Sequence, residues 1–149
     1  MSRRESLSKL GVFTPSCRIL VIDGDAAFQS ALGNAAVHAG HTAIPLTNSD
    51  RALAVANQEA PDLIVLDLAM HGPSGRVGRD VLAELKRVPE TEKIPVLVYS
   101  SHSVEFDRRH ALELGAEDFV LGPVDPTALI AKIERVVFRT SSGKFHTSQ

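Results

Sequence analysis

One stretch of the chain, residues 61–70, constrains the fold more than any other. Pro61 cannot extend a helix, and four apolar residues after Asp62 lead to a single carboxylate, Asp67. A short apolar run that contains Ile and Val and is bounded by turn signals predicts a strand buried on both faces. Because a carboxylate cannot remain uncompensated in a core, we expect Asp67 at the carboxyl edge of a sheet. In open α/β sheets, that edge is where ligands and chemistry are found.

The rest of the chain repeats this pattern, because strand-like and helix-like segments alternate five times with short connections. The expected strands are 18–22, 42–46, a central one ending at residue 67, 94–99 and 118–121. Such an alternation predicts a parallel sheet with right-handed crossovers and helices on both faces. We therefore expect a flavodoxin-like, doubly wound (βα)5 fold with strand order 2-1-3-4-5. One domain should span residues 17–139, between a flexible N-terminal arm (1–16) and a flexible C-terminal tail (140–149).

Composition excludes several classes of function. A net charge of -2 gives no electrostatic reason to bind nucleic acid or a membrane surface. No apolar run approaches the ~18 residues of a membrane span, and the single cysteine, Cys17, suits a reducing compartment. We therefore expect a cytoplasmic protein. The pair His38 and His41 straddles Gly40, which favours surface positions over metal ligation.

Polar residues fall at the ends of three expected strands: Asp23 after the first, Asp67 after the third and Ser100 after the fourth. In the expected strand order these strands are neighbours, so two carboxylates and a hydroxyl should converge. Like charges this close raise each other's pKa unless a cation lies between them, and hard oxygen ligands favour Mg²⁺. A carboxylate beside a divalent cation can attack a phosphoryl group and form an aspartyl phosphate.

At this point the chain resembles the receiver domain of bacterial two-component response regulators, of the chemotaxis type, over roughly residues 18–138. The resemblance depends on four segments in the right order and spacing: 19–23, 61–68, 94–100 and 114–119. Together these segments are specific, although each alone would be weak.

The resemblance implies roles for individual residues. Asp67 matches the phospho-acceptor, Ser100 the switch hydroxyl and Phe119 the switch aromatic. Asp23 and the main-chain carbonyl of Ala69, together with Asp67, match the ligands of Mg²⁺. Simpler roles are also open: Asp23 could hydrogen-bond nearby backbone N–H groups, Ser100 could be a turn residue, and Phe119 could be a packing residue.

Two departures from the family pattern bear on chemistry. The family has a second acid directly after the first, where this chain has Gly24; Asp25 follows, and its side chain should point elsewhere as it enters a helix. The family also has a Lys before the proline that follows the fifth strand, where this chain has Gly122. Loss of one comparable electrostatic stabiliser costs about 2.7–4 kcal/mol in related reactions. The loop after Met70 is about three residues longer than usual, and His71 takes the usual proline position.

The expected function is that of a single-domain receiver in a phosphorelay, with phosphorylation of Asp67 weakened or lost, and not that of an enzyme. Its partner would be a histidine kinase or another signalling protein, bound through the fourth helix, fifth strand and fifth helix. We expect a monomer or weak dimer.

An alternative from another class is a small phosphatase of the haloacid dehalogenase type. Its signature resembles residues 23–25, with Asp23 as nucleophile, Asp25 as acid/base and Ser100 as the second-motif hydroxyl. No Lys or later acidic pair completes that site, and Asp67 would have no role in it.

Overall fold

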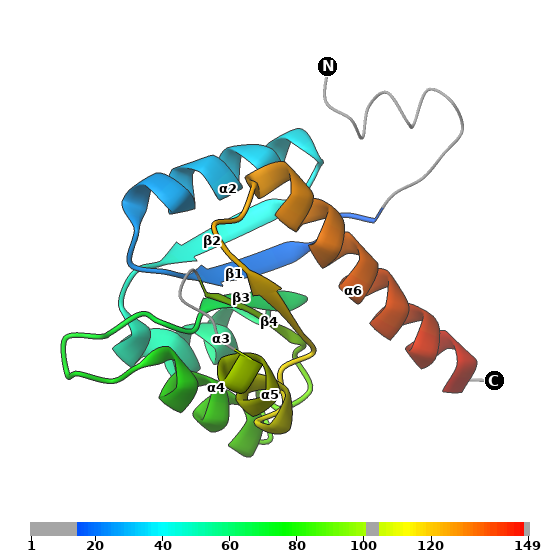
Figure 1. The fold of residues 1–149 in the computed structure, drawn as a ribbon. Coiled ribbons are helices and arrows are strands. Elements are labelled where there is room, and N and C mark those ends of the chain that lie inside the picture. Colours follow the sequence, from blue (N-terminus) through cyan, green and yellow to red (C-terminus); the bar gives the residue numbers. More distant parts are fainter. Residues whose placement is uncertain (1–14, 101–104, 148–149) are drawn as a thin grey trace.

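The computed structural model describes residues 15–100 and 105–147, and it forms five strands and five α-helices with one short 3-10 helix in this part of the chain (Figure 1). The strands are β1 (Arg18–Ile22), β2 (Thr42–Leu46), β3 (Leu63–Asp67), β4 (Val96–Ser100) and β5 (Asp118–Leu121). The helices are α2 (Ala26–His38), η1 (Ser49–Arg51), α3 (Ala52–Glu59), α4 (Gly78–Arg87), α5 (Glu105–Glu113) and α6 (Pro126–Thr147).

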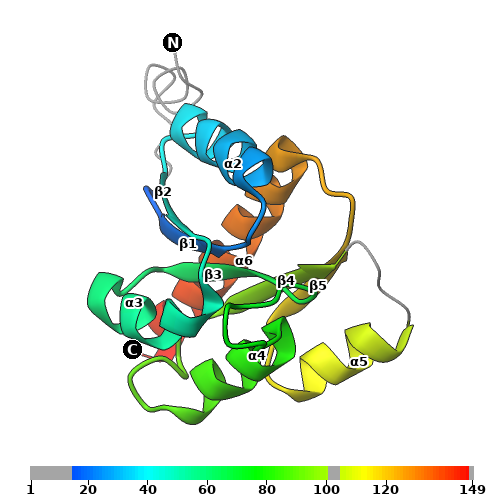
Figure 2. The same cartoon turned by 90° about the vertical axis from the view of Figure 1, so that its left-hand side faces the viewer.

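All strands pair in parallel in the order β2-β1-β3-β4-β5, which confirms the predicted doubly wound topology. Helices cover both faces, with α2 and α6 on one side of the sheet and α3, α4 and α5 on the other (Figure 2). The carboxyl ends of β1 and β3 therefore lie next to each other at the centre of the sheet, where the chain changes direction of winding.

Alternation along the strands divides the buried side chains into two cores. Leu20, Ile64 and Val98 face the layer of α3, α4 and α5. Val65 and Leu97, on the other face, pack with residues of α2 and α6. Because both faces are covered, these strands are continuous apolar runs, as the sequence indicated for β3.

The ends of α2 follow the expected rules. Asp25 is its N-cap, and its carboxylate accepts hydrogen bonds from the N–H groups of Ala27 and Phe28. Gly40, just after the helix, has φ of 89°, a conformation that glycine adopts without steric cost.

One expectation differs from the structure. His41 is buried, at 4% exposure, so its predicted surface position is wrong; its ring points into the fold because Glu134 of α6 supplies a partner there. The last helix, α6, extends to Thr147 and thus includes residues 140–147 of the segment expected to be a flexible tail. Residues 1–14 of the predicted arm lie outside the described residues. No helix in the described part of the chain has the length and apolar character needed to cross a membrane.

Candidate functional site

The register of the sheet brings the predicted acids together. Ile22 pairs with Leu66, so the next residues along the two strands, Asp23 and Asp67, emerge side by side. Asp67 in turn is level with Tyr99, and Ser100 follows as the last residue of β4. Two carboxylates and a hydroxyl thus share the carboxyl edge of three neighbouring strands.

Asp23 is the more buried of the two acids in the group of Asp23, Asp67 and Ser100, which we call the acid pocket. It is 4% exposed, and its Oδ1 accepts a hydrogen bond of 2.8 Å from the N–H of Asp25. The pKa of Asp23 is raised from 3.8 to about 6, mainly by burial. The hydrogen bond from the Asp25 N–H opposes this shift, and the charges of Asp67 and Asp25 add to it. A carboxyl group in this environment favours either a proton or a cation.

Asp67 is more accessible, since its residue is only half-buried. Its Oδ1 accepts a hydrogen bond of 3.0 Å from the N–H of Ala69, which orients the carboxylate at the end of β3. Helix α4 begins directly above, and a Cβ on Gly78 would come within 2.5 Å of the carbonyl oxygens of Asp67 and Leu68. Gly78 therefore permits the close approach of α4 to the backbone at the end of β3. Sequence reasoning missed this role, because the only signal was a glycine at the start of a helix.

The long loop after Met70 is fastened to the turn that follows β2. Ser74 donates from both its N–H (3.2 Å) and its hydroxyl (2.6 Å) to the carboxylate of Asp50. His71 is exposed and makes a backbone bridge with Val77 across this loop. Sequence reasoning placed no role on Asp50, because nothing in the local pattern links it to a loop 24 residues away.

Ser100 and Phe119 lie on neighbouring strands. Ser100 is 3% exposed, and its carbonyl oxygen accepts a hydrogen bond of 2.8 Å from the N–H of Gly122. Gly122, where the family has Lys, is thus adjacent to the strand end that carries the hydroxyl. Phe119 is buried in the core beside α3, α4 and α5.

The oxygen ligands at this edge are of the type that Mg²⁺ binds, but the protein supplies few of them. Asp23 and Asp67 supply hard carboxylate oxygens, the type that Mg²⁺ prefers. Among the described residues, however, no cluster of three or more His, Cys, Asp or Glu side chains could hold a metal ion. Asp25 does not contribute, because its carboxylate caps α2. If Mg²⁺ binds, Asp23, Asp67 and the carbonyl of Ala69 would hold it and water would complete its shell, and the ion would supply charge neutralisation for phosphoryl chemistry.

A parallel sheet of order 2-1-3-4-5, with acids after β1 and at the end of β3 and a hydroxyl at the end of β4, defines a receiver-type signalling domain. The family model of the response regulator receiver domain matches residues 19–134. The chain therefore belongs to the response regulator receiver family.

Individual relatives agree with this assignment. The chain is 32% identical over 125 residues to the phosphate regulon transcriptional regulatory protein PhoB of Pseudomonas aeruginosa, covering 84% of this chain and 53% of the relative. Identity to PhoB of Escherichia coli is 33% over 124 residues, with 83% and 53% covered. The chain thus spans about half the length of these curated relatives.

Solved structures give the same picture. A response regulator from Desulfuromonas acetoxidans matches with a TM-score of 0.71 and 30% identity, covering 80% of this chain and 95% of that one. NtrX from Brucella abortus matches with a TM-score of 0.78 and 29% identity, covering 90% of this chain and 30% of that one. Family membership, together with the capping role of Asp25, leaves the phosphatase alternative without support.

Proposed function

We propose that this chain is a receiver whose phosphorylation at Asp67 is weakened by Gly24 and Gly122, and whose output is docking to a signalling protein. Asp67 would be the phospho-acceptor, Ser100 the hydroxyl that binds the phosphoryl group, and Phe119 the aromatic side chain that follows Ser100. A histidine kinase would be the donor in the cytoplasm. The chemistry would be attack of the Asp67 carboxylate on a phosphohistidine phosphorus, with the imidazole as leaving group.

The observation that supports this proposal is that position 24 has space for an acidic side chain but is occupied by glycine. Apart from Gly24 and its two neighbours in the chain, no described residue has an atom within 4 Å of a Cβ placed on Gly24, so the fold has room for a side chain there. The sequence supplies none, and Asp25 is already used as a helix cap. Two carboxylates in place of three leave Mg²⁺ with fewer protein ligands and less negative charge to hold it, and binding should weaken accordingly.

Gly122 should weaken the reaction independently. A Lys at this position would place a fixed positive charge next to the end of β4, the strand that neighbours the end of β3, where the acyl phosphate of Asp67 would form. Positive charge aimed at developing negative charge is among the largest contributions to such reactions. Without it, both formation of the aspartyl phosphate and its signal to β4 should be reduced.

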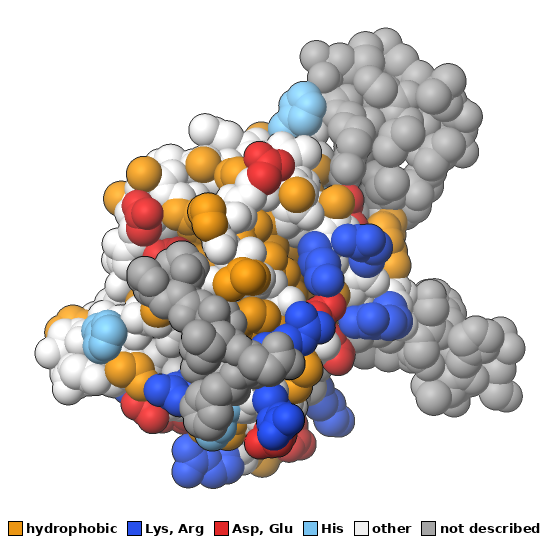
Figure 3. Space-filling view, in the orientation of Figure 1, with side chains coloured by type: hydrophobic (Ala, Val, Ile, Leu, Met, Phe, Trp, Pro, Cys, Tyr) orange, Lys and Arg blue, Asp and Glu red, His pale blue; other side chains and the backbone are white. Residues whose placement is uncertain are grey.

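The docking surface we propose is the face of α5, β5 and α6. A groove of about 340 Å³ runs along β5 and α6, and Leu121 at its edge is 61% exposed. Lys132 and Arg135 line the same groove, and Lys and Arg side chains gather beside apolar ones over α6 and β5 (Figure 3). A partner with an apolar contact patch and an acidic rim would complement this face.

The experiment measures phosphorylation of Asp67 directly. The protein is incubated with Mg²⁺ and excess acetyl phosphate, and the modified fraction is followed by intact mass. The wild-type chain should react slowly, and the double variant Gly24→Asp/Gly122→Lys should react at least about ten-fold faster because both missing charges are restored. Asp67→Asn in the double variant should abolish the reaction.

Gly33→Asp is the matched control, since position 33 also has open space for a side chain but lies in α2, away from the pocket. It should react as the wild type does. A wild-type chain that is modified as fast as the double variant would contradict the proposal and indicate a fully active receiver.

A further inference from the structure

Tyr99 is the residue of β4 that lies level with the proposed phospho-acceptor. It pairs with Asp67 in the register of the parallel sheet. Side chains alternate between the two faces of a strand, and Val65 and Leu97, two residues before Asp67 and Tyr99, both belong to the core on the side of α2 and α6. The side chains of Asp67 and Tyr99 therefore leave neighbouring strands on the same face of the sheet.

The tyrosine ring packs against the start of α2. Its centroid lies 5.0 Å from the centroid of the Phe28 ring, at an interplanar angle of 34°. Phe28 is in the first turn of α2, the helix that follows β1 and Asp23. Because β3 lies between β1 and β4 in the sheet, the two rings meet over the end of β3, which carries Asp67. Tyr99 thus crosses the sheet beside the acid pocket.

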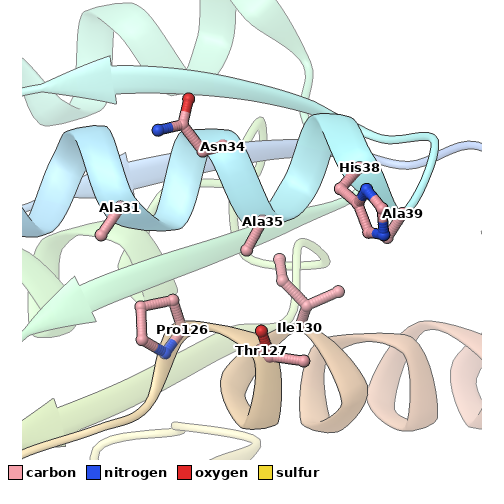
Figure 4. Close-up of a pocket in the computed structure, with 8 residues that line it drawn as sticks. All are labelled: Ala31, Asn34, Ala35, His38, Ala39, Pro126, Thr127 and Ile130. Atoms are coloured by element: carbon pink, nitrogen blue, oxygen red, sulfur yellow. The ribbon is translucent and has the colours of Figure 1, made fainter. Parts of the chain in front are cut away.

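Packing explains the ring of Tyr99 but not its hydroxyl. Farther along α2, Ala31 and Ala35 face α6, and their small side chains leave a groove of about 550 Å³ between the two helices (Figure 4). Phe28 lies one turn before Ala31 on the same face of α2, and there the rings of Phe28 and Tyr99 supply the bulk that alanine lacks. A phenylalanine ring on β4 would fill this space equally well.

The hydroxyl of Tyr99 is buried without a partner. The residue is 7% exposed, and its Oη has no hydrogen-bond partner among the residues that the structure describes. In this part of the chain, Ser49 Oγ is the only other buried side-chain oxygen or nitrogen in the same state. Buried hydroxyl groups are normally hydrogen-bonded, because leaving one unpaired costs free energy. An unpaired donor beside a reactive carboxylate indicates a partner that is present only when that carboxylate is modified.

From this arrangement we infer that the Tyr99 hydroxyl donates a hydrogen bond to the phosphoryl group on Asp67, and thus takes over part of the role of the lysine that Gly122 replaces. The inference rests on the proposed phosphorylation of Asp67. A phenol carries a proton at neutral pH, so Tyr99 donates a hydrogen bond and keeps its proton throughout the reaction. A neutral donor stabilises phosphoryl oxygens less than a lysine does, which agrees with a reaction that is weakened.

The test uses Tyr99→Phe, which removes one oxygen and keeps the ring. The variant is made in two backgrounds, Gly24→Asp and Gly24→Asp/Gly122→Lys, and modification of Asp67 by acetyl phosphate with Mg²⁺ is followed by intact mass. In the first background, Tyr99→Phe should slow modification at least about ten-fold, because a donor to the phosphoryl group is lost. In the second it should slow modification less than about three-fold, because the lysine supplies the stabilising charge. Thermal stability should not fall in either background, since the hydroxyl has no partner to lose in the unmodified protein.

Ser49→Ala is the matched control, because it removes the other unpaired buried hydroxyl, which lies on η1. It should leave the rate of modification unchanged. Equal rates with and without Tyr99→Phe in the Gly24→Asp background would overturn the inference. A fall in thermal stability would also overturn it, because the hydroxyl would then have a structural role. No modification of Asp67 in any background would refute the proposed function, and this inference with it.

A spectroscopic readout follows Tyr99 directly, because it is the only tyrosine of the chain and the chain has no tryptophan. The Gly24→Asp variant is titrated with Mg²⁺ and beryllofluoride, which mimics a phosphoryl group on Asp67. Tyrosine fluorescence should change until the site is saturated, since a new hydrogen bond to the phenol alters its emission, and Asp67→Asn should remove this change. Binding of beryllofluoride, detected by fluorine NMR, without a change in tyrosine fluorescence would overturn the inference.

Discussion

The two ends of the sheet hold buried polar groups in opposite electrostatic situations. At the carboxyl edge, Asp23 and Asp67 place like charges side by side, and the pKa of Asp23 rises to about 6. At the amino edge, His41 and Glu134 place a donor against an acceptor at 2.7 Å between Nε2 and Oε2. The same fold thus contains one site, at Asp23 and Asp67, where neighbouring charges repel. It contains another, at His41 and Glu134, where the buried polar groups are paired.

The geometry at the amino edge fixes the protonation of the histidine ring. The N–H of Cys17 donates to Nδ1 of His41 at 3.0 Å, so this nitrogen carries no proton. The proton of the neutral ring must then lie on Nε2 and be donated to the carboxylate of Glu134. This network joins the start of β2 to the middle of α6 and has the character of a structural clamp.

The contrast separates stability from function. A group whose partners are all present stabilises the fold, as at the amino edge. A group left with an unfavourable neighbour costs stability and remains available for a ligand, as at the acid pocket. The predictions that follow test this difference, starting with the largest effect.

Removing the clamp should cost the most. His41→Ala should lower the free energy of unfolding by about 3–5 kcal/mol, because it leaves the Glu134 carboxylate buried without this partner. Urea denaturation measures the loss. Glu134→Gln, which keeps an acceptor for Nε2–H, should cost clearly less.

The exposed histidine His71 supplies the control for this prediction. His71→Ala should change stability by less than about 0.5 kcal/mol, as is usual for exposed positions. Equal losses in His41→Ala and His71→Ala would show that the buried network is not a clamp.

Removing an acid from the acid pocket should instead raise the free energy of unfolding. The pKa of Asp23 is about 6 in the folded protein and 3.8 as its ordinary value, so the folded state keeps a proton that the unfolded state releases between these values. Stability therefore falls as pH rises through this window. Asp23→Asn should recover roughly 2–3 kcal/mol at pH 7 in the absence of Mg²⁺ and nothing below the ordinary pKa.

Thermal denaturation across this pH range measures the gain. Asp125→Asn is the control, since asparagine also caps helices and Asp125, the N-cap of α6, is not among the groups that shift the pKa of Asp23. A gain for Asp23→Asn that persists unchanged at acid pH would contradict the assigned cause.

The smallest effect concerns the coupling of the two acids. Asp67→Asn removes the neighbouring charge, so the pKa of Asp23 should fall below about 6. It should remain above the ordinary value, because burial is the larger cause of the shift. A carbon-detected NMR titration of the Asp23 carboxyl measures both, and an unchanged pKa would show that the carboxylates do not interact.

Much of the pocket could be predicted from the sequence, because strand ends are local signals. Asp67 ends an apolar run at the end of β3, Asp23 directly follows β1, and Ser100 is the last residue of β4. Once the alternation of strands and helices gives the strand order, the meeting of these residues follows from topology alone. The capping role of Asp25 was predictable for the same reason, since a helix cap needs only its own first turn.

The features that were missed all depend on contacts between distant segments. His41 and Glu134 are 93 residues apart, and each alone looks like an ordinary polar residue. The bonds from Ser74 to Asp50 and the close approach at Gly78 depend on how a loop and a helix settle over the sheet. No periodicity or spacing in the sequence encodes such meetings, because they follow from the packed arrangement.

The hydrogen bonds at either end of residues 26–49, a stretch without Asp, Glu, Lys or Arg, have a further consequence. Asp25, which precedes the stretch, donates its N–H to Asp23, and Asp50, which follows it, holds Ser74 in the loop after β3. The two ends of this uncharged stretch are thus tied to segments beside Asp23 and after Asp67. A displacement of the start of α2 would therefore act directly on the carboxylate of Asp23, and a displacement of η1 on the loop that follows Asp67.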